Sequence, residues 1–248
     1  MGAALASLLI FASFVTAFVS GIFGMAGGMM LMGVLAWMLP VQAAFVTHGI
    51  LQLVANGWRA VLHRRYIKLP IFGWFALATA LAAIAVSLIA WVPTKPVLFL
   101  LLGLMPLMIW LPKGWFAPDA ARPAQAFGAG FVATVLNLNA GVSGPLIDTV
   151  FVRTGLTRHE IIATKAAIQC LNHLSKIAVY GLVLVGKGGS GVPPLWLFAL
   201  AVPVSMAGTA LGGRVLDAMS DVDFKRWTAW IVTLIGAIYL FKAAALAW

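Results

Sequence analysis

The chain has 248 residues, of which 63% are hydrophobic and only 9% are charged, and its mean hydropathy is +1.05. Soluble domains carry about 25% charged residues, so the composition excludes a soluble domain and predicts a polytopic membrane protein. A net charge of +10 would suggest nucleic acid for a soluble protein, whereas in a membrane protein it is typical of cytoplasmic loops. We therefore expect a lipid bilayer, and no nucleic acid, as a partner. The single cysteine, Cys170, excludes an internal disulfide.

The first half begins with an apolar stretch over 4–39 that is interrupted at 21–28 (GIFGMAGG). Glycine is a weak helix former, and the piece after it is too short to cross a hydrocarbon core of about 30 Å. We therefore expect a re-entrant, broken helix over 4–39. Transmembrane helices are expected over 43–62, 69–91 and 96–112, which completes a first repeat over 1–112.

The second half has the same plan. A cytoplasmic linker is expected over 113–123, and the second repeat over 124–248 then comprises a broken helix at 124–152 and helices at 159–185, 193–212 and 226–247. Two segments align directly between the halves: 18–28 with 131–141, and 47–52 (THGILQ) with 164–169 (TKAAIQ). Polar residues recur at matching places in these apolar helices, so we expect an internal duplication.

Charge predicts the topology. If each half is a broken pair plus three spans, nearly all loop arginines and lysines share one side, and only Lys95, Lys187 and Lys242 lie on the other. The positive-inside rule favours this arrangement, with both termini periplasmic. An odd number of spans per half inverts the second repeat. The predicted fold class is an all-α polytopic membrane protein with two inverted repeats.

Two of the expected helices carry a polar face. Lys165, Gln169, His173 and Lys176 lie at offsets of 0, +4, +8 and +11, which is one side of a helix. Basic residues within a membrane are costly and usually functional, and one nearby acid cannot neutralise three cations, so we expect a bound anion. The predicted substrate-binding residues are Lys165, Lys176, Arg59, Gln52, Gln169, Asn137, Asn139, His48, His173, Asn56, Gly28, Gly141, Ser143 and Gly144.

Other interpretations of these residues stay open. The basic side chains could reach the membrane surface, Gln52 and Gln169 could join helices by hydrogen bonds, and Asp148 could form a structural ion pair. His48, His173 and Asp148 are also the candidates for coupling transport to protons. No catalytic motif or metal-ligand pattern occurs, so we expect no catalytic residue, no metal, no cofactor and no enzyme.

Several loose motifs, in the same order along nearly the whole chain, resemble those of the TauE/SafE family of membrane transporters. They are residues 21–28 (GIFGMAGG), 44–47 (AFVT), 139–145 (NAGVSGP), 155–164 (GLTRHEIIAT), 208–214 (GTALGGR) and 221–227 (DVDFKRW). The resemblance implies a secondary transporter that moves a small sulfur oxyanion or organosulfonate, such as sulfite, outward across a bacterial inner membrane. A passive anion channel on the same scaffold and a non-transporting subunit of an export complex are the alternatives. The sequence leaves the anion, the coupling ion and the oligomeric state open, a homodimer included.

Overall fold

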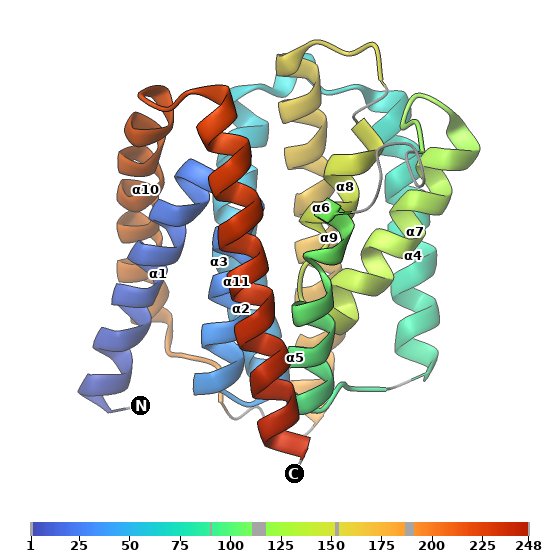
Figure 1. Ribbon diagram of the computed structural model, residues 1–248. Helices are drawn as coiled ribbons and strands as arrows, with labels where there is room; N and C mark the ends of the chain where they lie inside the picture. The colour runs from blue at the N-terminus through green and yellow to red at the C-terminus, as the bar shows by residue number, and fades with distance from the viewer. Residues whose placement is uncertain (1, 90, 111–117, 152–153, 187–190, 248) are drawn as a thin grey trace.

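The computed structural model describes residues 2–89, 91–110, 118–151, 154–186 and 191–247, and within them every regular element is a helix (Figure 1). The expected all-α class is therefore confirmed. The first half contains α1 (Ala3–Phe23), α2 (Met25–Met38), α3 (Val41–Leu62), the short 3-10 helix η1 (Arg64–Tyr66), α4 (Leu69–Ile89), α5 (Lys95–Leu104) and α6 (Leu107–Trp110). The second half contains α7 (Pro123–Ala140), α8 (Gly144–Phe151), α9 (Arg158–Gly186), α10 (Leu195–Asp217) and α11 (Asp221–Ala247).

The outer surface is that of a membrane protein. Within the described residues, five helices are long and apolar enough to cross a membrane, namely α1, α4, α9, α10 and most of α11. Large apolar side chains point outward, and Leu88, Leu195 and Phe241 are 81%, 84% and 76% exposed. A soluble protein rarely exposes apolar surface on this scale. The chain is therefore a multi-pass membrane protein.

The first broken helix turns at one residue. Gly24 has a φ of +60°, a conformation that favours glycine, and it separates α1 from α2. The two helices then pack so closely that a Cβ added to Gly27 would lie 2.4 Å from the Cβ of Ser20. In Figure 1 the chain rises along α1 and returns along α2 toward the end that it left. The break is narrower than 21–28, because Gly27 and Gly28 lie inside α2.

The second broken helix turns at Gly141, whose φ is +78°. Residues 141–143 form the connection, and α8 begins at Gly144. In Figure 1 the chain descends along α7 and returns upward along α8. The two broken helices therefore enter the bundle from opposite ends of the molecule.

The prediction of one continuous helix over 96–112 is wrong in one respect. This segment is divided into α5 and α6 around Met105 and Pro106. Proline lacks an N–H group and its ring clashes with the preceding turn, which interrupts a helix at this point. Residues 111–117 of that helix and of the expected linker lie outside the described residues, as does Lys187.

Helices of the two halves alternate in the packing. α1 packs on α10, α3 on α9, α4 on α7 and α5 on α11, and each pair joins one half to the other. The α1–α10 contact depends on glycine, since a Cβ at Gly212 would lie 2.2 Å from the carbonyl oxygen of Phe18. Neither half is therefore a separate unit.

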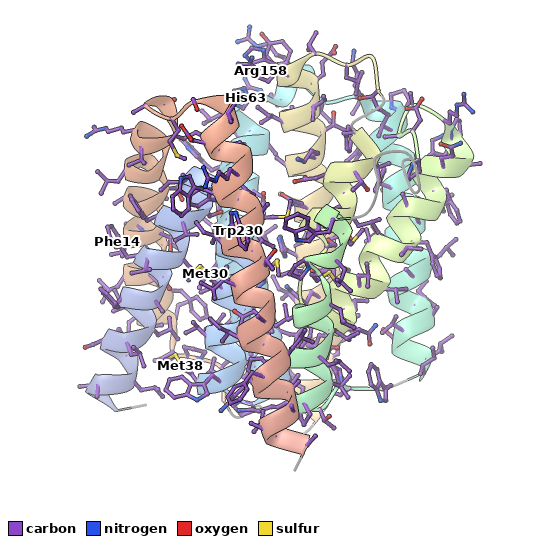
Figure 2. The ribbon with its side chains drawn as sticks, viewed as in Figure 1. Phe14, Met30, Met38, His63, Arg158 and Trp230 are labelled. Atoms are coloured by element: carbon purple, nitrogen blue, oxygen red, sulfur yellow. The ribbon has the colours of Figure 1, made fainter. Side chains whose placement is uncertain are left out.

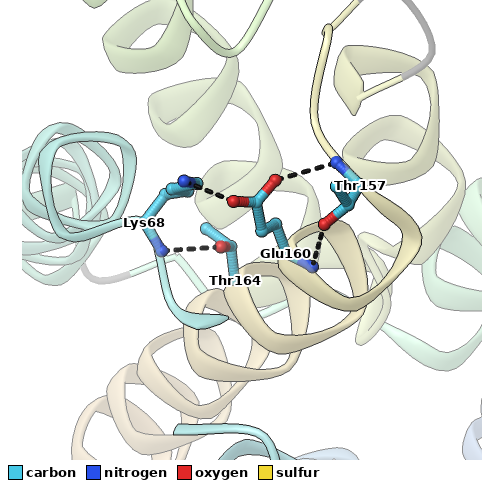
Figure 3. Close-up of polar contacts among 4 residues, drawn as sticks. All are labelled: Lys68, Thr157, Glu160 and Thr164. Atoms are coloured by element: carbon cyan, nitrogen blue, oxygen red, sulfur yellow. Dashed lines mark hydrogen bonds and ion pairs between the residues drawn. The ribbon is translucent and has the colours of Figure 1, made fainter. Parts of the chain in front are cut away.

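We call the end of the molecule that carries Arg64, Lys68 and Arg158 the basic end. At this end, contacts at the start of α9 hold neighbouring helices together. Thr157 and Glu160 form a capping box, in which the Thr157 N–H donates to Glu160 Oε2 over 2.8 Å and the Glu160 N–H donates to Thr157 Oγ1 (Figure 3). Lys68 forms an ion pair with Glu160, and its N–H donates to Thr164 Oγ1 over 2.9 Å. These contacts tie the start of α4 to the start of α9. Figure 2 shows this end, with His63 and Arg158, opposite Met38.

Candidate functional site

Lys176 of α9 is completely buried, with 0% of its surface exposed. Its Nζ atom lies 2.8 Å from Nδ1 of His48, 2.8 Å from the carbonyl oxygen of Gly141 and 3.5 Å from Oδ1 of Asn137. A lysine ammonium has three hydrogens to donate, and three acceptors surround it. We call Lys176, His48, Asn137, Gly141 and His173 the inner cluster. It joins α3, α9 and the turn after α7.

The tautomer of His48 follows from its two contacts. Its Nε2 atom lies 3.0 Å from the carbonyl oxygen of Gly28, and a carbonyl can only accept, so Nε2 carries the hydrogen. Nδ1 is then a lone pair that accepts from Lys176. The neutral imidazole of His48 therefore connects the first broken helix, at Gly28, to the lysine that the second one holds.

Lys176 has no counter-ion in the described part of the chain. The carboxylates that form ion pairs there belong to Asp119, Asp148 and Glu160, and none of them pairs with Lys176. The centroid of the Phe45 ring lies 5.8 Å from Nζ, and this ring offers a modest cation–π attraction. A buried charge surrounded only by neutral groups is costly. The inner cluster is therefore suited to receiving a negative charge.

His173 supplies a polar atom that is still free in this cluster. It lies nearly one turn before Lys176 on α9, and its ring centroid is 5.7 Å from that of His48. The side chain is 7% exposed, and Nδ1 finds no hydrogen-bond partner among the residues that the structure describes. Buried polar atoms are almost always paired. Such an atom beside a buried cation is a candidate contact for a ligand.

A hydrogen-bond network that the sequence analysis missed holds Asn137 in place. Asn137 Nδ2 donates to the carbonyl oxygen of Asn172 over 2.6 Å. The Asn172 amide accepts from Thr134 Oγ1 at 2.8 Å and from Thr79 Oγ1 at 3.4 Å, and it donates to Ser143 Oγ at 3.2 Å. These contacts link α4, α7 and α9. The one signal in the sequence was Asn172, a second amide beside His173 on an apolar helix.

The other predicted cations lie apart from the inner cluster. Lys165 forms an ion pair with Asp148 of α8, and the two side chains are 26% and 35% exposed. Arg59 of α3 is exposed and forms no ion pair within the described residues. We call Arg59, Lys165 and Asp148 the outer cluster. It carries two cations against one carboxylate.

The two clusters share one face of the α3–α9 pair. Lys165 and Lys176 are eleven residues apart on α9, and His48 and Arg59 are eleven apart on α3. Eleven residues make just over three turns, or about 16 Å along a helix. The single pocket that the sequence predicted is therefore divided into a buried level and a partly exposed level.

The remaining predicted residues contribute in different ways. Gln52 and Gln169 face the broken helices, since their Nε2 atoms lie 2.8 Å and 3.8 Å from where a Cβ would stand on Gly28 and Gly144. Asn56 and Asn139 instead donate to carbonyl oxygens of their own helices, those of Gln52 and Val135.

The glycine breaks contact the inner cluster through hydrogen-bond acceptors. The groups of Gly28 and Gly141 that contact His48 and Lys176 are carbonyl oxygens. In the described part of the chain, no group of three or more His, Cys, Asp or Glu side chains could hold a metal ion.

Comparison with known proteins agrees with this architecture. A family model described as Sulfite exporter TauE/SafE matches residues 9–239, which is nearly the whole chain. No curated protein and no solved structure matches.

Proposed function

The chain belongs to the TauE/SafE sulfite exporter family, and from this premise we propose that it is a secondary transporter that exports a small sulfur oxyanion or organosulfonate. The family is one of transporters, and the match covers both broken helices and both polar helices. The substrate, the outward direction and the location in a bacterial inner membrane are parts of this proposal.

The observation that carries the proposal is the environment of Lys176. Its Nζ atom is buried among neutral acceptors, two of them at 2.8 Å, and it pairs with no carboxylate in the described residues. An anion that entered this cluster would supply the missing negative charge. A sulfite-like anion has several oxygen acceptors, so it could accept from Lys176 and from the free Nδ1 of His173 at once. Asn137 and the amides of Gln52 and Gln169 would orient its other oxygens.

We also propose that the two halves are inverted repeats, over 1–112 and 124–248. The packing supports this, because exchanging α1–α5 with α7–α11 turns the α1–α10 contact into the α7–α4 contact and leaves α3–α9 and α5–α11 unchanged. Such an internal two-fold pattern is common in secondary transporters, whose binding sites lie at the repeat interface near the midplane. The inner cluster lies at this interface, between α3 and α9.

The interlocked helices constrain how the site could open. A motion of one whole half against the other would separate α1 from α10 and α4 from α7, two of the four pairs that pack across the halves. We therefore propose that these mixed pairs move as units about the central α3–α9 pair. Both termini lie at the same end in Figure 1, opposite the basic end, and we propose that they are periplasmic.

His48 offers a route to proton coupling. A second proton on His48 would occupy Nδ1, the atom that now accepts from Lys176. The proton and the lysine therefore compete for one lone pair, and protonation would release Lys176 toward an anion. Asp148 and His173 are the other candidates for the coupled group.

The test is flux from proteoliposomes that contain the purified protein and are preloaded with sulfite. The proposal predicts saturable efflux that responds to a proton gradient and is lost in Lys176→Met. Flux that never saturates and ignores the gradient would indicate the passive channel instead. No flux of any sulfur anion from wild-type protein that is shown to be folded would contradict both interpretations.

A further inference from the structure

The outer cluster lies outside the site proposed above, and it carries more positive charge than a structural ion pair needs. Lys165 forms an ion pair with Asp148, whereas Arg59, on the helix that packs against α9, forms no ion pair within the described residues. The cluster therefore keeps one uncompensated positive charge. Both members of the Lys165–Asp148 pair are also partly exposed, at 26% and 35%, so the protein itself does not enclose them.

We propose that the outer cluster is a second anion station, in which the Asp148 carboxylate occupies the place at Lys165 that a passing anion takes. This rests on the proposed function, because it gives the transported anion a stopping point between the basic end of the molecule and Lys176. Asp148 is then a tethered competitor of the substrate. It neutralises Lys165 when no anion is present and yields that position when one arrives.

The position of the outer cluster supports a relay to the inner one. Arg59 and Lys165 each lie eleven residues from an inner-cluster residue of the same helix. Both pairs are thus on one helix face, about 16 Å apart, and the step is along the α3–α9 contact. Gln169 lies one turn beyond Lys165 in the direction of Lys176, and its amide approaches Gly144 at the start of α8. An anion leaving Lys165 would therefore meet an amide donor on its way inward.

A second ion pair at the same end shows what a fixed carboxylate looks like. Glu160 pairs with Lys68, and it also accepts from the Thr157 N–H, which fixes it in the capping box (Figure 3). The Asp148 carboxylate has no hydrogen bond to the backbone in the described residues, and its contact there is Lys165. Partly exposed ion pairs contribute little to stability and are weakened by dissolved salt. Asp148 is accordingly the carboxylate that an anion could displace.

The test measures sulfite binding by calorimetric titration of the full chain in lipid nanodiscs. Asp148→Asn removes the competing carboxylate and keeps the shape of the side chain. We expect sulfite to bind roughly two- to fivefold more tightly, the factor that corresponds to one partly exposed ion pair. Glu160→Gln is the matched control, since it neutralises a lysine-paired carboxylate at the same end. The dissociation constant of sulfite for this variant should equal that for the wild type.

Two further variants make the outcome decisive. Lys165→Gln should weaken sulfite binding by a similar factor, and in that background Asp148→Asn should lose its effect, because there is no cation left to compete for. This variant also keeps the test possible if Asp148→Asn does not fold. Unchanged affinity in both Asp148→Asn and Lys165→Gln would overturn the outer station.

The failure of this inference can be told apart from failure of the proposed function. If sulfite binds the wild type and binding is lost in Lys176→Met, the inner site stands whatever the outer variants show. If the folded wild-type chain binds neither sulfite nor taurine, the transport proposal fails and the outer station fails with it.

Discussion

The inner and outer clusters hold a lysine in opposite ways. Lys176 is buried, and three neutral acceptors surround its ammonium. Lys165 is partly exposed, and a carboxylate of the same chain compensates its charge. The partly exposed Lys165 therefore has a counter-charge, although solvent could have screened it. The buried Lys176 has none in the described residues, although an uncompensated charge costs most there. This is the reverse of what stability alone would favour, and it indicates that function determines the inner arrangement.

The comparison is sharpest for the two lysines themselves. Lys176→Met should reduce sulfite affinity about a hundredfold, because a lost hydrogen bond to a charged group is worth up to about 3 kcal/mol. The same change should raise the melting temperature without ligand, since it removes a buried uncompensated charge. Lys165→Met should change affinity only a fewfold and lower the melting temperature slightly. Calorimetric titration and thermal unfolding measure both effects, and equal losses of affinity in the two variants would contradict the division into two levels.

The second prediction concerns Gly141, which shapes the turn and offers its carbonyl to Lys176. Gly141→Ala places a Cβ in a left-handed conformation (φ +78°) and 2.5 Å from the sulfur of Met32. We expect a loss of about 2–4 kcal/mol in the free energy of unfolding, together with most of the transport. Gly128→Ala is the control, because that glycine is inside α7 with nothing within 4 Å of its added Cβ. Denaturation of the two variants in detergent should show a loss for the first alone.

The third prediction tests the network behind Asn137. Thr134→Val keeps the shape of the side chain but removes the hydroxyl that donates to Asn172 over 2.8 Å. We expect about 1 kcal/mol less stability and a weaker affinity for sulfite, because Asn137 loses support. Thr228→Val removes a hydroxyl that only donates to its own helix, at Phe224, and should leave sulfite affinity unchanged. Equal affinities in the two variants would mean that the network has no influence on the inner cluster.

The smallest expected effect is that of Glu160→Gln. The change removes the ion pair with Lys68 and weakens the capping box at the start of α9. Partly exposed pairs contribute about 0.2–1 kcal/mol, so the melting temperature should fall by a few degrees at most, and efflux should be unchanged. A large loss of efflux would show that transport depends on the Lys68–Glu160 ion pair or on the capping box of α9.

Much of the architecture could be predicted from the sequence, because the physical signals there are strong. Long apolar stretches predicted the helices, and clusters of glycine predicted two helix breaks, which the structure places at Gly24 and Gly141. The polar spacing on α3 and α9 indicated that their side chains share one face, and the two helices do pack together. The split between α5 and α6 at Pro106 was readable in principle, since proline interrupts a helix.

The sequence does not show how deeply each charged side chain is buried. Lys165 and Lys176 lie on one helix face with similar neighbours in sequence, and only the position of α8 decides that Lys165 meets Asp148. The network around Asn172 was also hidden, because a lone threonine in an apolar helix commonly bonds to its own backbone. Thr134 also lies 2.9 Å from the Gly130 carbonyl of its own helix, and only the packing of α4 and α9 against α7 adds its contacts with Thr79 and Asn172.

The most direct test of the inner cluster is the thermal unfolding of the purified chain in the presence of single anions: sulfite, sulfate, thiosulfate, taurine, sulfoacetate, acetate and chloride. A ligand that binds the folded state and is present at 100 times its dissociation constant should add about 2.7 kcal/mol of stability. We predict that at least one sulfur anion raises the melting temperature of the wild type, that acetate and chloride do not, and that Lys176→Met shows no rise. Equal stabilisation of the wild type and Lys176→Met by a sulfur anion, or none by any anion in folded protein, would contradict the assignment of Lys176 to the binding site.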